Sequence, residues 1–414
     1  MSKGVIWIVN KDAAPTKEYA THIRSTREAA FFQSKGYEVK IICGNRIHNS
    51  QIVHPVNGRC SIEEHDGVSY VFVNTMKYGT STVKRVLSYF LFSFNVFKLK
   101  SLGTPDIVIH DTKTPFDMPI MRFARKCKAK YIVDVEDLWP RCFEYMGFLS
   151  HGNPIMKFLY SLERKLYSKA DHVVFTMEGC KDYIKDHKWD KDNGGPIYLS
   201  KIHYVNNGIV LKDYEENKLK FKIEDPDLED PSTFKVIYLG SIREANNLGQ
   251  LIEAAKYLQD IPNIKVLIYG DGPERKPLED QCRSENIGNV SFKQKWINPE
   301  YVPYVLSKAD VNILNYTLGW AHYGGSMNKM FMSFASGKPI VCNADLSYSE
   351  IKRRNLGIDE YLDTPQKYAG AIKKMYLMPK DEYSAMCGRV RETAKTYDIP
   401  YLMEMLAKYC EINI

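Results

Sequence analysis

Two loops in the second half of the sequence carry residues that suit a bound phosphate. One reads Gly240-Ser241-Ile242-Arg243 and follows the apolar run Phe234–Leu239, and the other reads Gly270-Asp271-Gly272 and follows Lys265–Tyr269. Glycine at the end of a strand lets the backbone approach an anion, and arginine offers a fork of hydrogen-bond donors. An exposed loop arginine and an ordinary strand-to-helix turn explain the same residues nearly as well. Each loop alone is therefore a weak indication of a diphosphate site.

A third loop carries the strongest indication. The segment Gly324-Gly325-Ser326-Met327-Asn328-Lys329 leads into a predicted helix that ends at Gly337. We expect Ser326 to cap this helix, whose N-terminal amides would face an anion, and Gly337 to end it with a positive φ. Lys329 in the first turn opposes the helix dipole, which is explained if a bound anion offsets its charge. The alternative is an exposed, screened lysine that is tolerated at little cost.

The first half of the sequence carries candidate groups for an acceptor. Glu136 and Asp137 follow the apolar run Tyr131–Val135, where a carboxylate could orient or deprotonate a hydroxyl if burial raises its pKa. An acidic pair that satisfies the amides of a helix start is the alternative. His22 and Arg24, after the first predicted strand, are further acceptor-side candidates, although a lone histidine on a helix is more often structural.

The elements that position these residues follow from the hydrophobic pattern. Helices are predicted at Tyr19–Lys35, Leu248–Leu258 and Pro299–Lys308, and the charged stretch Lys212–Pro231 is predicted to link two halves of the chain. The alternation of strands and helices predicts an α/β protein with two Rossmann-like domains, whose parallel sheets face a central cleft. The predicted strands are Val5–Val9, Val39–Cys43, Val68–Val73, Ile107–His110, Tyr131–Val135, His172–Phe175, Phe234–Leu239, Lys265–Tyr269, Val290–Phe292, Val311–Leu314 and Ile340–Cys342.

Composition limits the compartment and the partners. The chain has 414 residues, a net charge of +7 and nine cysteines, with no zinc-ligand or redox spacing among them. The modest basicity favours acidic small molecules or an anionic membrane surface, and it is too weak to indicate nucleic acid. We interpret the cysteines as reduced thiols and the N-terminus as a first strand rather than a signal peptide, and no run is apolar enough to span a membrane. We therefore expect a cytoplasmic protein.

The stretch Val83–Leu102 combines a helical apolar stripe with basic ends. Such a helix suits the interface of an anionic membrane, which would place the protein peripherally at the inner face. Packing of the stripe on the first sheet is the more ordinary interpretation. The stripe consists of Val83, Val86, Leu87, Phe90, Leu91, Phe94 and Phe97.

The second half resembles glycosyltransferase family 4, in particular the subgroup that builds bacterial surface polysaccharides. The resemblance runs from Val236 to about Cys342, and a looser match in the first half includes Glu136-Asp137-Leu138-Trp139-Pro140. It is carried by an ordered set of segments rather than by any one of them: the Gly240 to Arg243 loop, Leu251-Ile252-Glu253-Ala254-Ala255, Gly270-Asp271-Gly272-Pro273-Glu274, Ser307-Lys308-Ala309-Asp310-Val311, and Asn328-Lys329 leading into Ala335-Ser336-Gly337-Lys338-Pro339.

This resemblance implies a GT-B fold and transfer with retention of configuration. It also implies no metal or other cofactor, since Arg243 and Lys329 would neutralise the leaving diphosphate. The donor would lie mainly on the C-terminal domain, residues 213–395, and the acceptor on residues 1–212, with a helix in 396–414 packing back on the first domain. Trp296 and Ile297 lie where relatives hold the nucleobase; packing of Trp296 in the core is preferred here over stacking on the base.

The sequence departs from the family pattern at several positions. Gly324 and Met332 occupy the places of two glutamates that contact the sugar and the ribose in many members, and Glu136 stands where a histidine is common. Arg243 would act from a shifted position in its loop, because Ser241 and Asn246 occupy the usual places of the basic pair.

The resulting hypothesis is a hexosyltransferase. It would move a sugar from a nucleotide diphosphate sugar to a glycan or a polyprenyl-diphosphate-linked acceptor in surface polysaccharide biosynthesis. The alternative is a non-catalytic, glycosyltransferase-like binding subunit of a polysaccharide assembly complex, which kept the fold and lost turnover with its glutamates.

Overall fold

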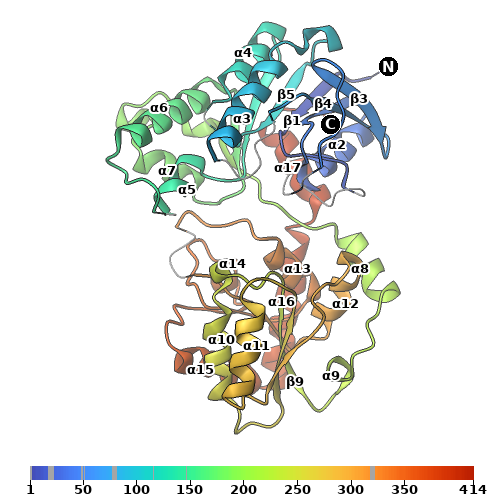
Figure 1. The fold of residues 1–414 in the computed structure, drawn as a ribbon, viewed down its shortest axis with the longest axis vertical. Helices are drawn as coiled ribbons and strands as arrows, with labels where there is room; N and C mark the ends of the chain where they lie inside the picture. Colours follow the sequence, from blue (N-terminus) through green and yellow to red (C-terminus); the bar gives the residue numbers. More distant parts are fainter. Residues whose placement is uncertain are drawn as a thin grey trace. The chain divides into compact units, whose positions relative to one another are not determined.

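The computed structural model describes residues 2–16, 23–47, 50, 52–76, 82–114, 116–145, 147–317 and 322–414. Its contacts divide the chain into two compact units, each built on its own sheet (Figure 1). Unit 1 comprises Met1–Asn206 together with Met403–Ile414, and unit 2 comprises Asn207–Leu402. Both units have the α/β architecture that the alternating pattern predicts.

Unit 1 contains an eight-stranded sheet in the order β3-β4-β2-β1-β5-β6-β7-β8. The neighbouring strands are parallel, except that β3 pairs antiparallel with β4. Central strands such as β1 and β5 are buried along most of their length, which is why they read as continuous apolar runs. The strands are β1 (Val5–Val9), β2 (Glu38–Gly44), β3 (Cys60–His65), β4 (Val68–Val73), β5 (Ile107–Asp111), β6 (Lys130–Val135), β7 (His172–Phe175) and β8 (Ile202–Tyr204).

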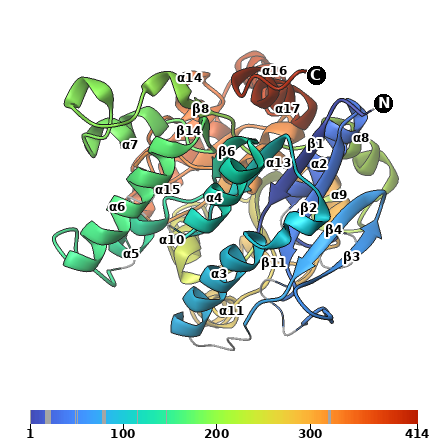
Figure 2. The same ribbon diagram turned by 90° about the horizontal axis from the view of Figure 1, so that it is seen from above.

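Helices cover this sheet, and α3, α4 and α6 follow one another along it (Figure 2). The Trp7 ring on β1 stacks on Phe123 of α4 at 5.1 Å between ring centroids, which fixes that helix over the centre of the sheet. The helices are α2 (Ile23–Ser34), α3 (Thr82–Val96), α4 (Met118–Cys127), α5 (Trp139–Tyr145), α6 (Pro154–Lys169) and α7 (Cys180–Asp186), with 3₁₀ turns η1 (Leu99–Leu102), η2 (Lys191–Asn193) and η3 (Leu199–Lys201).

The edge strand β3 was missed by the hydrophobic pattern. Its residues are only partly buried, and it forms a hairpin with β4 through Asp66 and Gly67, whose φ angles are 51° and 75°. Two positive φ angles are what an Asp-Gly hairpin turn requires. The dipeptide was therefore the available signal for this strand.

Helix α3 packs on unit 1 through the face opposite to the predicted stripe. Tyr89 and Phe92 are buried, whereas Leu87, Phe90 and Phe94 are 47%, 49% and 41% exposed. The expectation that the stripe itself docks on the sheet is wrong, because residues about half a helical turn away from it fill that position. The exposed face also carries charge, since the Lys98 ammonium lies 3.9 Å from the centre of the Phe94 ring.

Unit 2 contains a six-stranded parallel sheet in the order β11-β10-β9-β12-β13-β14. The strands are β9 (Phe234–Leu239), β10 (Ile264–Tyr269), β11 (Val290–Phe292), β12 (Val311–Leu314), β13 (Ile340–Cys342) and β14 (Gly357–Asp359). The helices are α8 (Leu211–Lys220), α9 (Pro226–Glu229), α10 (Leu248–Lys256), α11 (Arg275–Ser284), α12 (Val302–Ser307), α13 (Asn328–Ser336), α14 (Glu350–Arg353), α15 (Pro365–Tyr376) and α16 (Lys380–Lys395), with 3₁₀ turns η4 (Glu244–Asn246) and η5 (Pro299–Tyr301).

The stretch Lys212–Pro231 is not a linker. It forms most of α8 and all of α9, and Asp225 at the start of α9 ties it to the unit 2 sheet. The Asp225 carboxylate accepts hydrogen bonds from the Tyr269 hydroxyl and from the Lys293 ammonium, each at 2.9 Å. Its charges and prolines, which resemble a linker composition, instead serve helix caps and ion pairs.

The last helix, α17 (Ile399–Tyr409), begins in unit 2, and from Met403 onward its residues belong to unit 1. The Tyr37 hydroxyl donates to the Asn413 carbonyl at 2.8 Å, the Lys130 ammonium donates to the Cys410 carbonyl at 2.9 Å, and the Tyr409 ring stacks on His203. All nine cysteines are free thiols. Within the described ranges, no helix combines the length and the apolar character needed to cross a membrane.

Candidate functional site

The loops after β9 and β10 are packed backbone against backbone. A Cβ atom on Gly270 would lie 1.9 Å from the Gly240 carbonyl oxygen, and one on Gly272 would lie 2.1 Å from the Ile242 carbonyl oxygen. The Gly240 amide donates to the carbonyl of Tyr269 at the end of β10, the Ile242 amide donates to that of Asp271, and the Gly270 amide donates to that of Gln294 after β11. The two glycines therefore serve the packing of one loop on the other, and these three amides are not available to a phosphate.

Lys329 occupies the space that Gly240 leaves open. A Cβ atom on Gly240 would lie 2.2 Å from Lys329 Cε, so only glycine allows the lysine to lie there. The Lys329 ammonium donates to the Tyr238 hydroxyl at 2.7 Å and lies 4.6 Å from the centre of that ring. The sequence predicted Lys329 and Gly240 from separate motifs, and the structure brings them into contact.

The Lys329 ammonium has no counter-charge in the part of the chain that the structure describes. Within the described residues it forms no ion pair, and burial lowers its pKa to about 8. A buried cation whose pKa falls for want of a partner is stabilised by any anion that reaches it. A charged lysine in the first turn of α13 therefore costs free energy, as predicted, and burial makes this cost larger than it would be at an exposed position.

The start of α13 differs from the prediction by one residue. Met327, not Ser326, is the N-cap, with φ and ψ of −110° and 113°, because the chain turns helical only at Asn328. The Ser326 hydroxyl is buried and has no hydrogen-bond partner among the described residues. Gly337 ends the helix at φ 68°, as predicted. The other predicted residues of this segment, Gly324, Gly325 and Asn328, lie in the loop and the first turn.

Arg243 and Trp296 are both in solvent. The Arg243 side chain is exposed and forms no ion pair or hydrogen bond with any described residue. Trp296 is 77% exposed, so the interpretation of Trp296 as a core residue is wrong. The following residue, Ile297, packs partly buried against the apolar cluster around α12 and so anchors the loop that presents the indole. Met332, in place of a glutamate, also packs against apolar clusters.

In unit 1, the carboxyl ends of β5 and β6 bring the predicted Glu136 together with Asp111 and Lys113, which the sequence did not indicate. The Lys113 ammonium lies 2.9 Å from an Asp111 oxygen and 2.5 Å from a Glu136 oxygen. Burial lowers the pKa of Lys113, but Asp111 and Glu136 outweigh it and hold that pKa well above its ordinary value. Glu136 is thus half of a fixed ion pair, whereas Asp137 is exposed. Lys113 could have been found as a cation following a buried strand, opposite the predicted acids.

Arg24 has a structural position rather than the predicted acceptor-side one. It is buried, its guanidinium donates to Asp134 at 2.7 Å, and it also donates to the carbonyls of Val205 and Asn206. These bonds tie α2 to the end of β6 and to the last residues of this part of unit 1. Burial raises the pKa of the neighbouring Glu28 to about 8, against the opposing charge of Arg24. His22 lies outside the described residues.

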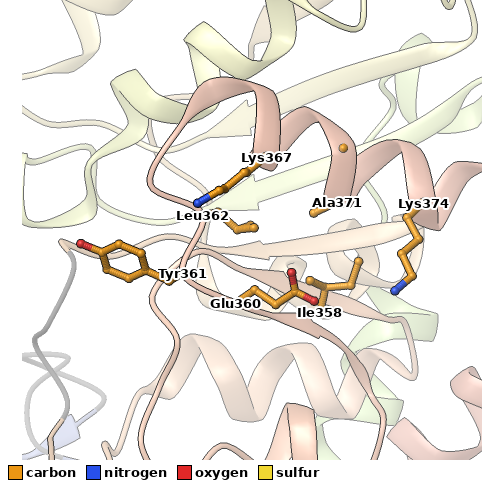
Figure 3. A pocket seen from close by; sticks show the side chains of 8 residues that line it. Ile358, Glu360, Tyr361, Leu362, Lys367, Ala371 and Lys374 are labelled. Atoms are coloured by element: carbon orange, nitrogen blue, oxygen red, sulfur yellow. The ribbon is translucent and has the colours of Figure 1, made fainter.

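A groove of about 380 Å³ lies elsewhere in unit 2, between β14 and α15 (Figure 3). Tyr361 and Lys374 stand at opposite ends of it, and none of the predicted site residues lines it. It is lined by Ile358, Glu360, Tyr361, Leu362, Lys367, Gly370, Ala371 and Lys374.

Comparisons with known proteins agree with this geometry. Residues 220–394 match the family model described as "Glycosyl transferases group 1". The chain is 23% identical over 251 residues to a chitobiosyldiphosphodolichol beta-mannosyltransferase of Debaryomyces hansenii, covering 54% of this chain and 50% of that protein. It is 24% identical over 299 residues to the putative teichuronic acid biosynthesis glycosyltransferase TuaH of Bacillus subtilis, covering 68% of this chain and 67% of that protein.

Likeness to solved structures extends over both units. A structure from E. coli, described as trehalose-6-phosphate bound with UDP-2-fluoro glucose, matches with a TM-score of 0.70 at 10% identity and covers 99% of both chains. The fold is therefore that of the GT-B glycosyltransferases, as predicted. The residues that match the group 1 family model lie within unit 2, and the chain spans about half (50%) of the length of the mannosyltransferase that it matches.

Proposed function

We propose that the chain is a glycosyltransferase of family 4 that transfers a hexose with retention of configuration and without a metal. The donor is a nucleotide diphosphate sugar bound by unit 2. The acceptor, bound by unit 1, is a glycan or a polyprenyl-diphosphate-linked glycan in surface polysaccharide biosynthesis. The name of the teichuronic acid relative supports the polysaccharide role, and the name of the diphosphodolichol relative supports a lipid-diphosphate acceptor.

The uncompensated Lys329 carries this proposal. In the transfer, the bond from the sugar's anomeric carbon to the diphosphate oxygen breaks, and negative charge develops on the diphosphate. The acceptor oxygen bonds to the anomeric carbon, and its hydroxyl proton passes to the departing phosphate oxygen. A buried ammonium already held against Gly240 would stabilise that charge without reorganisation. Arg243, which is exposed and has no side-chain partner among the described residues, is the second cation proposed to close on the diphosphate. Trp296 would stack on the base, for which its exposed indole is suited.

Glu136 is proposed to orient the acceptor. Its ion pair with Lys113 holds the carboxylate in place at the end of β6, where it can accept a hydrogen bond from an acceptor hydroxyl. Asp137, exposed beside it, would assist in holding the acceptor.

The exposed face of α3 supports peripheral contact with an anionic membrane. Leu87, Phe90 and Phe94 present apolar surface, and Lys98 on the same side would meet anionic headgroups. Sedimentation with vesicles of phosphatidylglycerol and phosphatidylcholine tests this contact at low salt. We expect wild type to co-sediment and the Phe90→Ser, Phe94→Ser double variant to remain in solution with an unchanged melting temperature. Wild-type protein that stays in solution at low salt would refute membrane contact.

The donor site is tested by thermal shift with UDP, GDP, ADP and dTDP, with and without EDTA. We expect one diphosphate to raise the melting temperature in both conditions, and Lys329→Ala to abolish the shift. Lys380→Ala is the matched control, because Lys380 also lies in the first turn of a unit 2 helix but is exposed. A wild-type protein that none of the four stabilises, or a shift lost in EDTA, would contradict the proposal.

A non-catalytic binding subunit is the second candidate. Met332 packs against apolar neighbours where many relatives hold a carboxylate, which favours loss of turnover. Measuring donor hydrolysis and sugar transfer separates the two functions. A protein that binds a nucleoside diphosphate but neither hydrolyses nor transfers the sugar at high enzyme concentration is the binding subunit.

A further inference from the structure

The Tyr238 side chain connects Lys329 to the loop that carries Arg243. Tyr238 lies in β9, an interior strand of the unit 2 sheet, and its side chain is fully buried. Its hydroxyl donates to the Ser241 carbonyl at 2.6 Å and accepts from the Lys329 ammonium at 2.7 Å. One side chain therefore contacts both the lysine on which the proposed function depends and the backbone two residues before Arg243.

The direction of these two hydrogen bonds follows from the groups that make them. A carbonyl oxygen carries no proton, so the Tyr238 hydroxyl must donate its single proton to Ser241. Its oxygen then has only lone pairs to offer to Lys329, which must be the donor. Burial raises the pKa of Tyr238 above its ordinary value, so the phenol keeps its proton. The hydroxyl is therefore a fixed acceptor for the Lys329 ammonium.

A second buried side chain holds the other end of the loop that carries Arg243. The Asn315 side-chain amide, just after β12, donates to the carbonyls of Asn246 and Asn247 at 2.8 and 2.6 Å. Asn315 accepts in turn from the Tyr368 hydroxyl at 2.9 Å. The backbone is therefore anchored on both sides of Arg243, although the Arg243 side chain itself is exposed.

The Lys329 ammonium relies on the Tyr238 hydroxyl because no carboxylate accompanies it in the described part of the chain. The hydroxyl supplies a hydrogen-bond acceptor, and the ring beneath adds a cation–π contact at 4.6 Å. Phenylalanine at position 238 would keep the ring and remove the acceptor. A buried ammonium that loses its acceptor becomes more costly, so it should release its proton at a lower pH and lose its fixed position beside Gly240.

The other titratable side chains near Tyr238 stay uncharged around neutral pH. Tyr316 follows β12 and Tyr368 lies on α15, and burial raises the pKa of each well above its ordinary value. Burial likewise raises the pKa of Cys342, at the end of β13. Lys329, whose pKa burial lowers to about 8, is therefore the group in this described part of unit 2 that should titrate between pH 7 and 9. The charged side chains of the adjoining loops are exposed: Arg243, Glu244 and Asp271.

We propose that Tyr238 is a positioning residue of the donor site, whose hydroxyl holds the Lys329 ammonium in place and ties it to the loop that carries Arg243. Both cations would then meet one diphosphate in a fixed relation to each other. This inference rests on the proposed function and adds the residue that sets the position of its buried cation. Tyr238 does not touch the diphosphate; it acts through Lys329.

The test is a double-mutant cycle in which titration calorimetry measures binding of UDP, GDP, ADP or dTDP, whichever stabilises wild type, at pH 7, 8 and 9. Loss of one hydrogen bond to a charged group should lower the pH at which Lys329 releases its proton by about one unit. We therefore expect Tyr238→Phe to raise the dissociation constant about twofold at pH 7 and about tenfold at pH 9. In the Lys329→Met background the same substitution should change nothing at any pH, because the group through which Tyr238 acts is gone.

Tyr269→Phe is the matched control. Tyr269 is buried in the neighbouring strand β10, and its hydroxyl donates to Asp225 at 2.9 Å. The substitution removes a buried hydroxyl of the same kind away from Lys329, so it should lower the melting temperature and keep the wild-type dependence of affinity on pH. A Tyr238→Phe protein that behaves like this control would overturn the positioning role. So would an equal loss of affinity in the wild-type and Lys329→Met backgrounds.

The outcomes separate this inference from the proposed function. If wild type binds none of the four diphosphates, the proposed donor site fails. If wild type binds one of them and Lys329→Met weakens that binding, but Tyr238→Phe matches Tyr269→Phe, this inference alone fails. If the Lys329→Met background binds too weakly to measure, the comparison of the two phenylalanine variants between pH 7 and 9 decides.

Discussion

The lowered pKa of Lys329 predicts that nucleoside diphosphate binding weakens as the pH rises above 8. Burial against Gly240 and Tyr238, without a carboxylate, holds this pKa at about 8 in the free protein, compared with 10.5 for an ordinary lysine. A diphosphate in contact restores the missing counter-charge and raises the pKa again. Because each pKa unit corresponds to about 1.4 kcal/mol, a return to the ordinary value couples the proton and the ligand by about 3 kcal/mol.

The magnitude follows from the fraction of protein that carries the proton. At pH 7 nearly all free Lys329 is protonated, and at pH 9 only about a tenth is, so the apparent dissociation constant should increase about tenfold over this interval. Binding at pH 9 should also take up nearly one proton. Calorimetry at pH 7, 8 and 9, in buffers of different ionisation enthalpy, measures both quantities.

Lys329→Met provides the decisive comparison. It should bind the diphosphate more weakly at pH 7 and show no change between pH 7 and 9, because the titrating group is gone. Wild-type affinity that stays flat across this range would refute the reasoning. So would a Met variant that loses affinity as steeply as wild type, since another group would then be titrating.

The lowered pKa of Lys329 also affects the stability of the free protein, which should rise with pH where ligand affinity falls. A lysine whose pKa is lowered on folding binds fewer protons in the folded state, so it destabilises the free protein below pH 8, and this cost fades as the pH approaches the ordinary lysine value. Lys329→Met should therefore raise the melting temperature of the free protein at pH 7 by several degrees, for a gain of about 1–3 kcal/mol. A variant less stable than wild type at pH 7 would show that the lysine is a structural group.

Three further outcomes follow from the site. Gly270→Ala would place a methyl group 1.9 Å from the Gly240 carbonyl and should destabilise unit 2 by about 3 kcal/mol or more in chemical denaturation, whereas Gly249→Ala, whose Cβ meets only the Leu278 side chain at 3.8 Å, should be neutral or stabilising. Trp296→Ala should leave the melting temperature unchanged, because the indole is 77% exposed, but should weaken nucleoside diphosphate binding by about tenfold; an equal loss of stability would instead indicate a packing role. Lys113→Met leaves the carboxylates of Asp111 and Glu136 without their cation and should lower the free energy of unfolding by about 3–5 kcal/mol. Changing Glu136 to Gln in the same chain should restore part of that loss. No recovery would show that Lys113 acts elsewhere.

Much of the fold could be predicted because local patterns decide it. Strands such as Val68–Val73 and Phe234–Leu239 have the predicted bounds, since strands that are buried on both faces are apolar along most of their length. Edge strands escape this rule: β3 is only partly buried, and β14 is three residues long. The segment Lys212–Pro231 shows the converse error, because charge and proline describe helix caps and ion pairs as well as they describe a linker.

In the candidate site too, some features could be predicted from the sequence and others could not. The sequence by itself determined which residue types stand at strand ends and helix starts, including Lys329, Gly240 and Glu136, because those positions follow from periodicity and from ordered motifs. Only the tertiary structure decided what these residues contact. That Gly240 makes room for Lys329 and that Lys113 pairs with Glu136 depend on segments distant in the chain, and no local pattern encodes such a contact. Burial, which sets whether a charge such as that of Lys329 is costly or harmless, is likewise a property of the folded chain alone.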